Sequence, residues 1–167
     1  MRLFTQDIDT LRTLYIFNLK KALDMEQKSV TSLTDLVGRV TNSELSKAFI
    51  THLDESRTHV VRVEGLLRRL TSGTEAATCN AMEGLLAEAS ATIGDVTDPW
   101  IRDIALIGVA QQIEHHEIAV YGTLRRWAVL LGLGQEAGVL ESIEAEEIHG
   151  NEVLSELSDR INLKAAA

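Results

Sequence analysis

Apolar residues recur every three to four positions along four long stretches of the chain. This spacing predicts amphipathic α-helices, because the apolar residues of a half-buried strand alternate instead. We expect the four helices at about residues 7–40, 43–71, 98–131 and 135–162. In the long connection between the second and third, residues 81–91 repeat apolar residues at the same spacing. They predict a short extra helix that lies across the other four.

The breaks between these stretches contain residues that start and stop helices. Asp7 or Asp9 is expected to cap the first helix, and Ser43 and Ser46 offer capping hydroxyls to the second. Asp98-Pro99 predicts the start of the third helix, because an acidic cap followed by proline is typical of a first turn.

The order of long and short connections indicates the fold class. Short turns at residues 41–43 and at Gly132-Leu133-Gly134 each join two helices into an antiparallel pair, and one long crossover joins the pairs. This connectivity is that of ferritin-like bundles. We therefore predict an all-α fold, a ferritin-like antiparallel four-helix bundle with one long crossover carrying a short extra helix. A length of 167 residues suits a single domain over residues 1–167.

Composition and charge exclude several classes of protein. A net charge of −9 gives no attraction for nucleic acid or anionic lipid, so neither is expected as a partner. The apolar runs are too short to span a membrane. The single cysteine, Cys79, excludes an internal disulfide, and the N-terminal segment lacks the pattern of a signal peptide. We expect a cytoplasmic protein.

Two carboxylates interrupt the apolar helix faces. At about 100° per residue, Glu26 falls in the middle of the apolar face of the first helix, and Glu117 does so on the third. A buried carboxylate is costly unless it is paired or binds a metal. The partners of these two residues are therefore expected to decide the function.

The second and fourth helices also place polar residues near their apolar faces. His52 and His59 lie within the face of the second helix, with Glu55 at its edge. On the fourth helix Glu147 lies on the face and Glu146 lies about 70° from its centre. His149 is about 130° away, which is an exposed phase.

This arrangement matches the pattern of carboxylate-bridged di-metal bundles. Such proteins use single glutamates from two helices and Glu-x-x-His pairs from the other two. Oxygen and imidazole ligands suit iron or manganese. Residues 146–149 form a literal Glu-x-x-His, and the equal separation of 29 residues from Glu26 to Glu55 and from Glu117 to Glu146 supports the pairing. The candidate ligands are Glu26, His52, Glu55, His59, Glu114, Glu117, Glu146, Glu147 and His149.

A metal-free interpretation remains open from the residues alone. A core histidine can be satisfied by ordinary hydrogen bonds, and a Glu-x-x-His match on an acidic helix can lie at the surface. Glu26 and Glu117 would then need other partners, and helix phase offers Tyr15, Tyr121 and Arg57.

Three segments of the chain resemble a known family, the YciE/YciF-type ferritin-like proteins of bacteria. The segments are residues 45–55, 79–89 and 102–124, and the resemblance extends over about residues 5–160. It implies a rubrerythrin-like bundle that is often dimeric, binds metal and is associated with stress responses. The ligand positions that it implies are Glu26, His52, Glu55, Glu114, His115 and Glu117.

The chain departs from the family pattern at two places. Arg57 stands where an acidic residue or histidine is common, and residues 146–151 replace a more acidic run. An inward Arg57 would oppose a second metal, whereas His149 would restore a nitrogen ligand.

Two hypotheses follow for the function. The first is a ferritin-like protein that binds iron or manganese in a di-metal centre, with an oxidase or peroxide-scavenging role in stress as one option and enzymatic activity left open. The alternative is a metal-free bundle with a structural or interaction role in stress. The expected partners are metal ions and a second copy of the chain.

Overall fold

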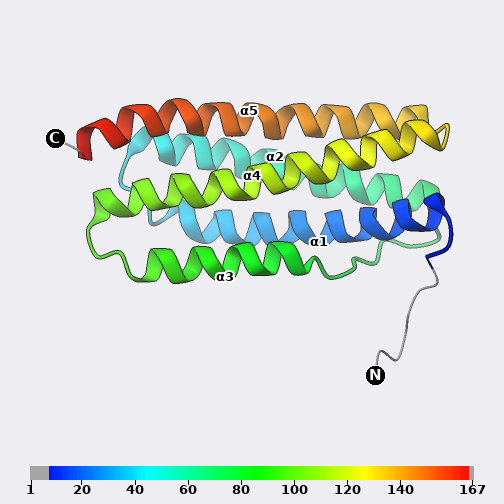
Figure 1. Cartoon of the computed structure of the whole chain (residues 1–167), viewed down its shortest axis with the longest axis horizontal. Coiled ribbons are helices and arrows are strands. Elements are labelled where there is room, and N and C mark those ends of the chain that lie inside the picture. The colour runs from blue at the N-terminus through cyan, green and yellow to red at the C-terminus, as the bar shows by residue number, and fades with distance from the viewer. Residues whose placement is uncertain (1–7, 166–167) are drawn as a thin grey trace, which may run out of the picture.

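The bundle is built from long helices that run side by side. The computed structural model describes residues 8–165, with the side chains of residues 8–161. In that range the elements are α1 (Leu11–Val37), α2 (Ser43–Leu70), α3 (Asn80–Gly94), α4 (Pro99–Leu130) and α5 (Gly134–Ala165). Figure 1 shows α1 and α2 as one antiparallel pair and α4 and α5 as another, joined by the crossover that carries α3. The predicted all-α, ferritin-like bundle is confirmed.

The first two helices begin at caps that differ from the predicted ones. Thr10 caps α1, and its backbone N–H is bonded in return by Thr13. Asp9 therefore is not the cap, and Asp7 lies outside the described residues. The Asn42 side chain caps α2 by accepting two backbone N–H bonds, because an amide oxygen one residue earlier reaches the first-turn donors better than Ser43 or Ser46.

The third predicted helix, α4, begins and ends as expected. Asp98 accepts hydrogen bonds from the backbone of Trp100 and Ile101, and Pro99 is the first helical residue. After the C-cap Leu131, the backbone turns at Gly132, whose φ of 71° lies in the left-handed region that favours glycine.

The short helix α3 lies along the bundle and not across it, contrary to our prediction. It runs beside α1 in Figure 1 and packs against both α1 and α4. Its buried residues Met82, Ala89 and Ile93 lie on one side of the helix, and packing that side along α1 and α4 buries all three. The crossover is tied to α1 by a hydrogen bond from the Cys79 N–H to Asp24.

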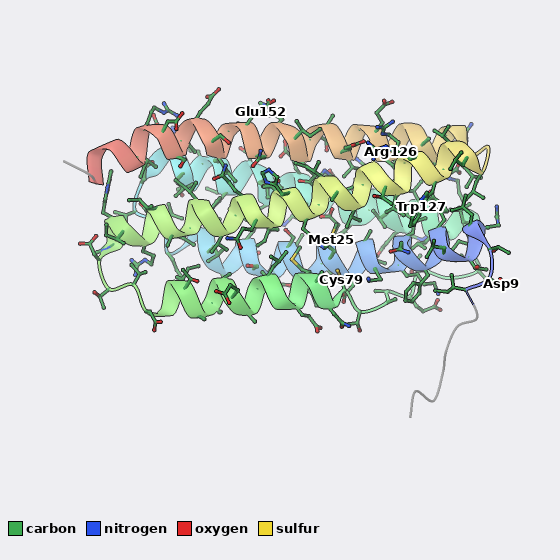
Figure 2. The ribbon with its side chains drawn as sticks, viewed as in Figure 1. Asp9, Met25, Cys79, Arg126, Trp127 and Glu152 are labelled. Atoms are coloured by element: carbon green, nitrogen blue, oxygen red, sulfur yellow. The ribbon has the colours of Figure 1, made fainter. Side chains whose placement is uncertain are left out.

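The apolar core has two parts. One contains Met25 and Cys79, labelled in Figure 2, together with side chains such as Leu66 and Ile143. The other contains Phe49 and side chains such as Leu106, Leu157 and Ile161. Along α1, α2 and α5 the two parts are separated by buried polar residues, so a polar layer crosses the middle of the bundle.

A buried carboxylate ties the turn between α1 and α2 to α4. Asp103 accepts hydrogen bonds from the backbone N–H groups of Thr41 and Asn42, at 3.0 and 2.7 Å.

Within the described residues, no helix has the length and apolar character needed to cross a membrane.

Candidate metal centre

Six ionisable side chains meet in the middle of the bundle, and we call them the polar layer. Four helices contribute, so the layer exists only when the bundle is assembled. Its exposed fractions are 0% for Glu26, His59, Glu117 and Glu147, 2% for Glu114 and 7% for His52.

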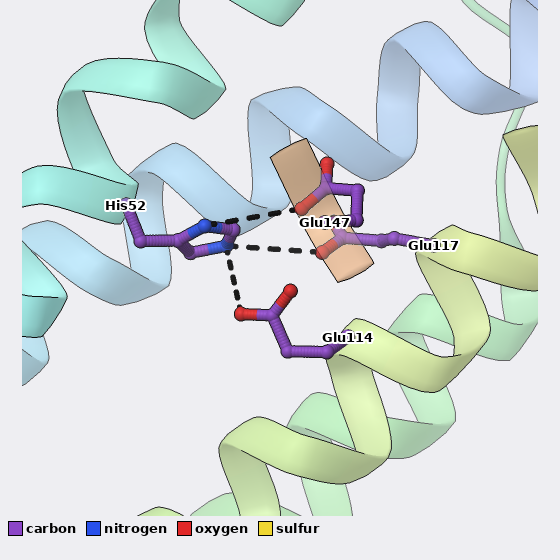
Figure 3. Close-up of side chains that lie close together, drawn as sticks. All are labelled: His52, Glu114, Glu117 and Glu147. Atoms are coloured by element: carbon purple, nitrogen blue, oxygen red, sulfur yellow. Dashed lines mark ion pairs between the residues drawn. The ribbon is translucent and has the colours of Figure 1, made fainter. Parts of the chain in front are cut away.

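The first group of the polar layer is formed by His52, Glu114, Glu117 and Glu147 (Figure 3). The two ring nitrogens of His52 face the three carboxylates. Its Nε2 is 3.3 Å from Glu114 and 3.9 Å from Glu117, and its Nδ1 is 3.8 Å from Glu147. One ligand atom from each residue can be chosen so that all four lie within 4.8 Å of one another, as around a single ion.

The second group is formed by Glu26, His59 and Glu147. His59 Nδ1 is 3.0 Å from Glu147 and 3.5 Å from Glu26. Glu147 therefore belongs to both groups, with Oε2 toward His52 and Oε1 toward His59. A carboxylate with one oxygen in each of two adjacent groups is placed as a bridging ligand would be.

Polar side chains close the second group on its outer sides. The buried Tyr121 hydroxyl donates a hydrogen bond to Glu26, and its ring meets His59 edge-on. His59 Nε2 donates to Glu146 at 2.7 Å, and Arg62 holds both oxygens of Glu146 at 2.9 Å. The other nitrogen of His59, Nδ1, is thereby left facing the carboxylates of the second group.

Many buried atoms of the polar layer have no hydrogen-bond partner. Both oxygens of Glu117 and of Glu147 are in this state, as are one oxygen each of Glu26 and Glu114 and the Nδ1 atoms of His52 and His59. Buried polar atoms in native proteins are almost always paired, and the closest contact within this set is the 3.0 Å ion pair of His59 Nδ1 with Glu147. All atoms of the set are oxygens or imidazole nitrogens, the ligand types that iron and manganese accept.

The electrostatics of the layer indicate the same need for positive charge. Burial and the neighbouring Glu147 raise the pKa of Glu114 to about 10, and burial raises the pKa of Glu117 and of Glu26. Burial lowers the pKa of His52 to about 4, whereas Glu147 and Glu26 outweigh burial and raise that of His59 to about 11. Without metal, protons must therefore neutralise carboxylates here, and the two groups of buried donors could each hold a metal ion.

Comparison with known proteins identifies the family. The family model described as a domain of unknown function, DUF892, matches residues 10–167. The chain belongs to this family. It is 32% identical to Protein YciF of Escherichia coli (strain K12) over 161 residues, which cover 95% of this chain and 97% of the relative.

Solved structures of similar proteins have the same fold as this DUF892 chain. The crystal structure of the E. coli stress protein YciF gives a TM-score of 0.89 at 32% identity, over 94% of this chain and 99% of the other. YcfI of Rhodopseudomonas palustris, provisionally described as a structural protein, gives 0.88 at 32% identity, over 92% and 98%. The YciF-type resemblance inferred from the sequence is thereby confirmed.

Three of the predicted ligands of this DUF892 protein do not lie in the polar layer. Glu55 and Glu146 lie at its edge, with side chains that are 32% and 28% exposed. His149 is 71% exposed and has Glu152 as its ion-pair partner. His115, which the resemblance implied, is exposed and bonds the carbonyl of Gln111 in its own helix.

Helix phase also offered three residues as metal-free partners of Glu26 and Glu117, and only one of them hydrogen-bonds to either glutamate. Tyr121 does bond Glu26, but Arg57 is 54% exposed and pairs with Asp54. Arg57 therefore brings no positive charge to the centre. The hydroxyl of Tyr15 is buried without a hydrogen-bond partner and bonds neither glutamate.

Sequence reasoning missed Arg62, which holds Glu146 against His59. The signal was present, because Arg62 follows His59 by three residues and so lies one turn further along the same side of α2. A search for cations one turn from each candidate ligand would have found it.

Proposed function

We propose that this protein binds two ions of iron or manganese in its polar layer. His52, Glu114 and Glu117 would hold one ion, and Glu26 and His59 the other. Glu147 would bridge them. This assignment follows the two groups of buried donors, which share Glu147 and no other residue.

The observation that carries the proposal is the set of buried carboxylate oxygens without hydrogen-bond partners. Several kcal/mol are lost when a charged group is buried without compensation, and four carboxylates in one layer also repel one another. His59 supplies positive charge to only part of the layer. Divalent ions would compensate all of it.

When bound, such ions would supply redox chemistry toward oxygen species, so an oxidase or peroxide-scavenging role in stress is included in the proposal. The E. coli relative YciF is described as a stress protein, which favours that setting. The chain's own residues would orient the ligands. Tyr121 would hold Glu26 through its hydroxyl, and Glu146 would fix the ring of His59 with Nδ1 toward the ions.

Metal content tests the proposal directly. Protein purified with iron or manganese is expected to contain about two equivalents by mass spectrometry, as in di-metal bundles. The double variant Glu26→Ala/Glu117→Ala is expected to lose most of it, whereas Glu75→Gln, an exposed carboxylate, is expected to keep it. Less than about a tenth of an equivalent in the unaltered chain, unchanged in the double variant, would contradict the proposal.

The alternative, a metal-free structural or interaction module, is favoured by one contact and one comparison. Tyr121 already bonds Glu26, and the relative YcfI is described as a structural protein. This alternative predicts a melting temperature that neither a chelator nor added metal changes. The di-metal proposal predicts a rise with metal, because binding to the folded state alone stabilises it.

A homodimer in the cytoplasm completes the proposal. The free, buried thiol of Cys79 supports this location, because a reducing compartment keeps thiols unpaired. Sedimentation of the purified chain tests the dimer. The expected molecular mass is twice that of one chain.

A further inference from the structure

A pocket of about 250 Å³ opens beside the polar layer, between α2 and α5. One part of its wall is apolar and includes Phe49, Val153 and Leu154. The other part is polar and is formed by His52, Glu55, Glu114 and His149. Lysine and arginine are absent from the described residues that line it, so nothing in the wall repels a cation.

Two buried side chains that line this pocket, which we call its floor, have atoms without hydrogen-bond partners. His52 Nδ1 and Glu114 Oε2 have no hydrogen bond, and both residues line the pocket and belong to the first group. The second group, in contrast, lines no part of it. A shallower hollow nearby is lined by Glu146 and Arg62 but by none of the six residues of the polar layer. A cavity of about 20 Å³ between α1, α2 and α4 also reaches His52 and Glu114. The pocket between α2 and α5 is more than ten times larger, so it is the wider approach to the layer.

Two ligand-type side chains stand at the mouth. The Glu55 carboxylate is 32% exposed and lies 3.9 Å from His52 Nδ1. His149 is 71% exposed. Both are ordinary metal ligands, yet neither belongs to the groups of buried donors. An ion bound by either side chain would still contact water, because both side chains are partly exposed.

Gly150 lies where α5 comes close to the floor of the pocket, and its lack of a side chain leaves the pocket open there. A Cβ built at this position would lie 3.3 Å from both oxygens of Glu114, so α5 approaches the Glu114 carboxylate closely here. Any larger side chain would project against Glu114 and into the pocket that Gly150 lines.

We propose that this pocket is the path by which a divalent cation reaches the polar layer, with Glu55 and His149 as its transient capture site. The ion then passes to Glu114 and His52 at the floor. This inference rests on the proposed di-metal function but assigns Glu55 and His149 to uptake and not to the final centre. It predicts that their loss slows loading and leaves the final metal content unchanged.

The test measures the rate and the final extent of Co²⁺ loading into the metal-free, full-length chain, by stopped-flow absorbance and mass spectrometry. The double variant Glu55→Gln/His149→Gln is expected to load about tenfold more slowly, the size of effect that local steering of ions produces. Its final Co²⁺ content is expected to equal that of the unaltered chain. The control Glu75→Gln/Glu141→Gln removes more negative charge at residues that do not line the pocket, and it is expected to load at the normal rate.

Gly150→Leu gives an independent test, because it fills the space beside Glu114 while every proposed ligand residue remains in the chain. It is expected to load more slowly than Gly150→Ala, which adds only the Cβ. Normal loading rates in both the double variant and Gly150→Leu, at full final content, would overturn the uptake path and leave the di-metal proposal standing. A wild-type chain that binds no Co²⁺ would overturn both.

Discussion

Glu117 shows most clearly why the polar layer needs a cation. Both of its carboxylate oxygens are buried and lack a hydrogen bond. Burial and the charge of Glu147 raise its pKa well above the ordinary value, so its charged form is unfavourable in the metal-free bundle. The same carboxylate becomes favourable once an ion neutralises it.

The variant Glu117→Gln separates these two effects. In metal-free protein at about pH 8 it is expected to increase the free energy of unfolding, because a neutral amide avoids the cost of keeping the buried Glu117 carboxyl uncharged at that pH. Urea unfolding in the presence of a chelator measures this change. The same variant is expected to bind less metal. A loss of stability without metal would contradict this account of the layer.

The pH dependence of the metal-free protein follows from the same groups. The pKa of Glu114 rises from 4.5 to about 10, so its contribution to stability is complete below 4.5 and is lost as the pH rises toward 10. His59, raised from 6.5 to about 11, loses its contribution over the upper part of this range. His52, lowered to about 4, has the opposite dependence and loses its contribution as the pH falls from 6.5 to 4.

We therefore expect the melting temperature of metal-free protein to fall between about pH 6.5 and pH 9, and saturating Mn²⁺ to reduce this fall. Metal replaces the protons that the buried carboxylates hold at neutral pH, so apparent affinity should rise with pH. Thermal unfolding at three pH values, with and without Mn²⁺, measures both. A metal-free melting temperature that rises over this interval would contradict the assignment.

Helix phase predicted the buried residues better than motif spacing did. Glu26 and Glu117 fell at the centres of apolar faces and are fully buried. The Glu-x-x-His spacing indicated Glu146 and His149, which are both partly exposed. Helix phase instead placed Glu147 on the apolar face, and Glu147 is the residue that is fully buried. Phase reports which side of a helix faces the core, whereas a spacing match occurs readily on any glutamate-rich surface.

At the scale of elements, the periodicity predicted each long helix, because burial requires an apolar stripe of period 3.6. Helix starts were less predictable, since several polar residues near a boundary can serve as caps. Thr10 and not Asp9 caps α1, because the pair with Thr13 satisfies two backbone groups at once. The direction of α3 depends on the groove between α1 and α4, which no local pattern reveals.

Asp103 gives a test of how the elements are held together. Because its carboxylate accepts bonds from Thr41 and Asn42, Asp103→Ala would leave the turn between α1 and α2 unsatisfied. We expect a loss of about 1–3 kcal/mol in the free energy of unfolding, the usual contribution of hydrogen bonds to a charged acceptor. The exposed Asp159→Ala is the control. Equal effects of the two variants in urea unfolding would contradict the role of Asp103.

At the scale of the whole molecule, the apolar core is divided by a layer that weakens the bundle unless it is filled. The four long helices all contribute to the layer, so an ion bound there would link all of them. This explains why the fold could be predicted from the sequence while the ligand set could not. The fold depends on the stripes of single helices, but the ligand set depends on how four stripes meet.

Added Mn²⁺ is therefore expected to raise the melting temperature of the metal-free chain by several degrees. A ligand at about 100 times its Kd adds about 2.7 kcal/mol to the stability of the folded state. Glu26→Ala/Glu117→Ala is expected to lose this response, and Glu75→Gln to keep it. An identical shift in both variants, as from ions bound at the acidic surface, would contradict binding in the layer.

The most direct test of the di-metal centre is an anomalous-difference map from crystals grown with Mn²⁺, recorded at the manganese edge. The account predicts two peaks, one among His52, Glu114, Glu117 and Glu147 and one among Glu26, His59 and Glu147. A map without a peak in the polar layer, from crystals in which those side chains are ordered, would contradict it.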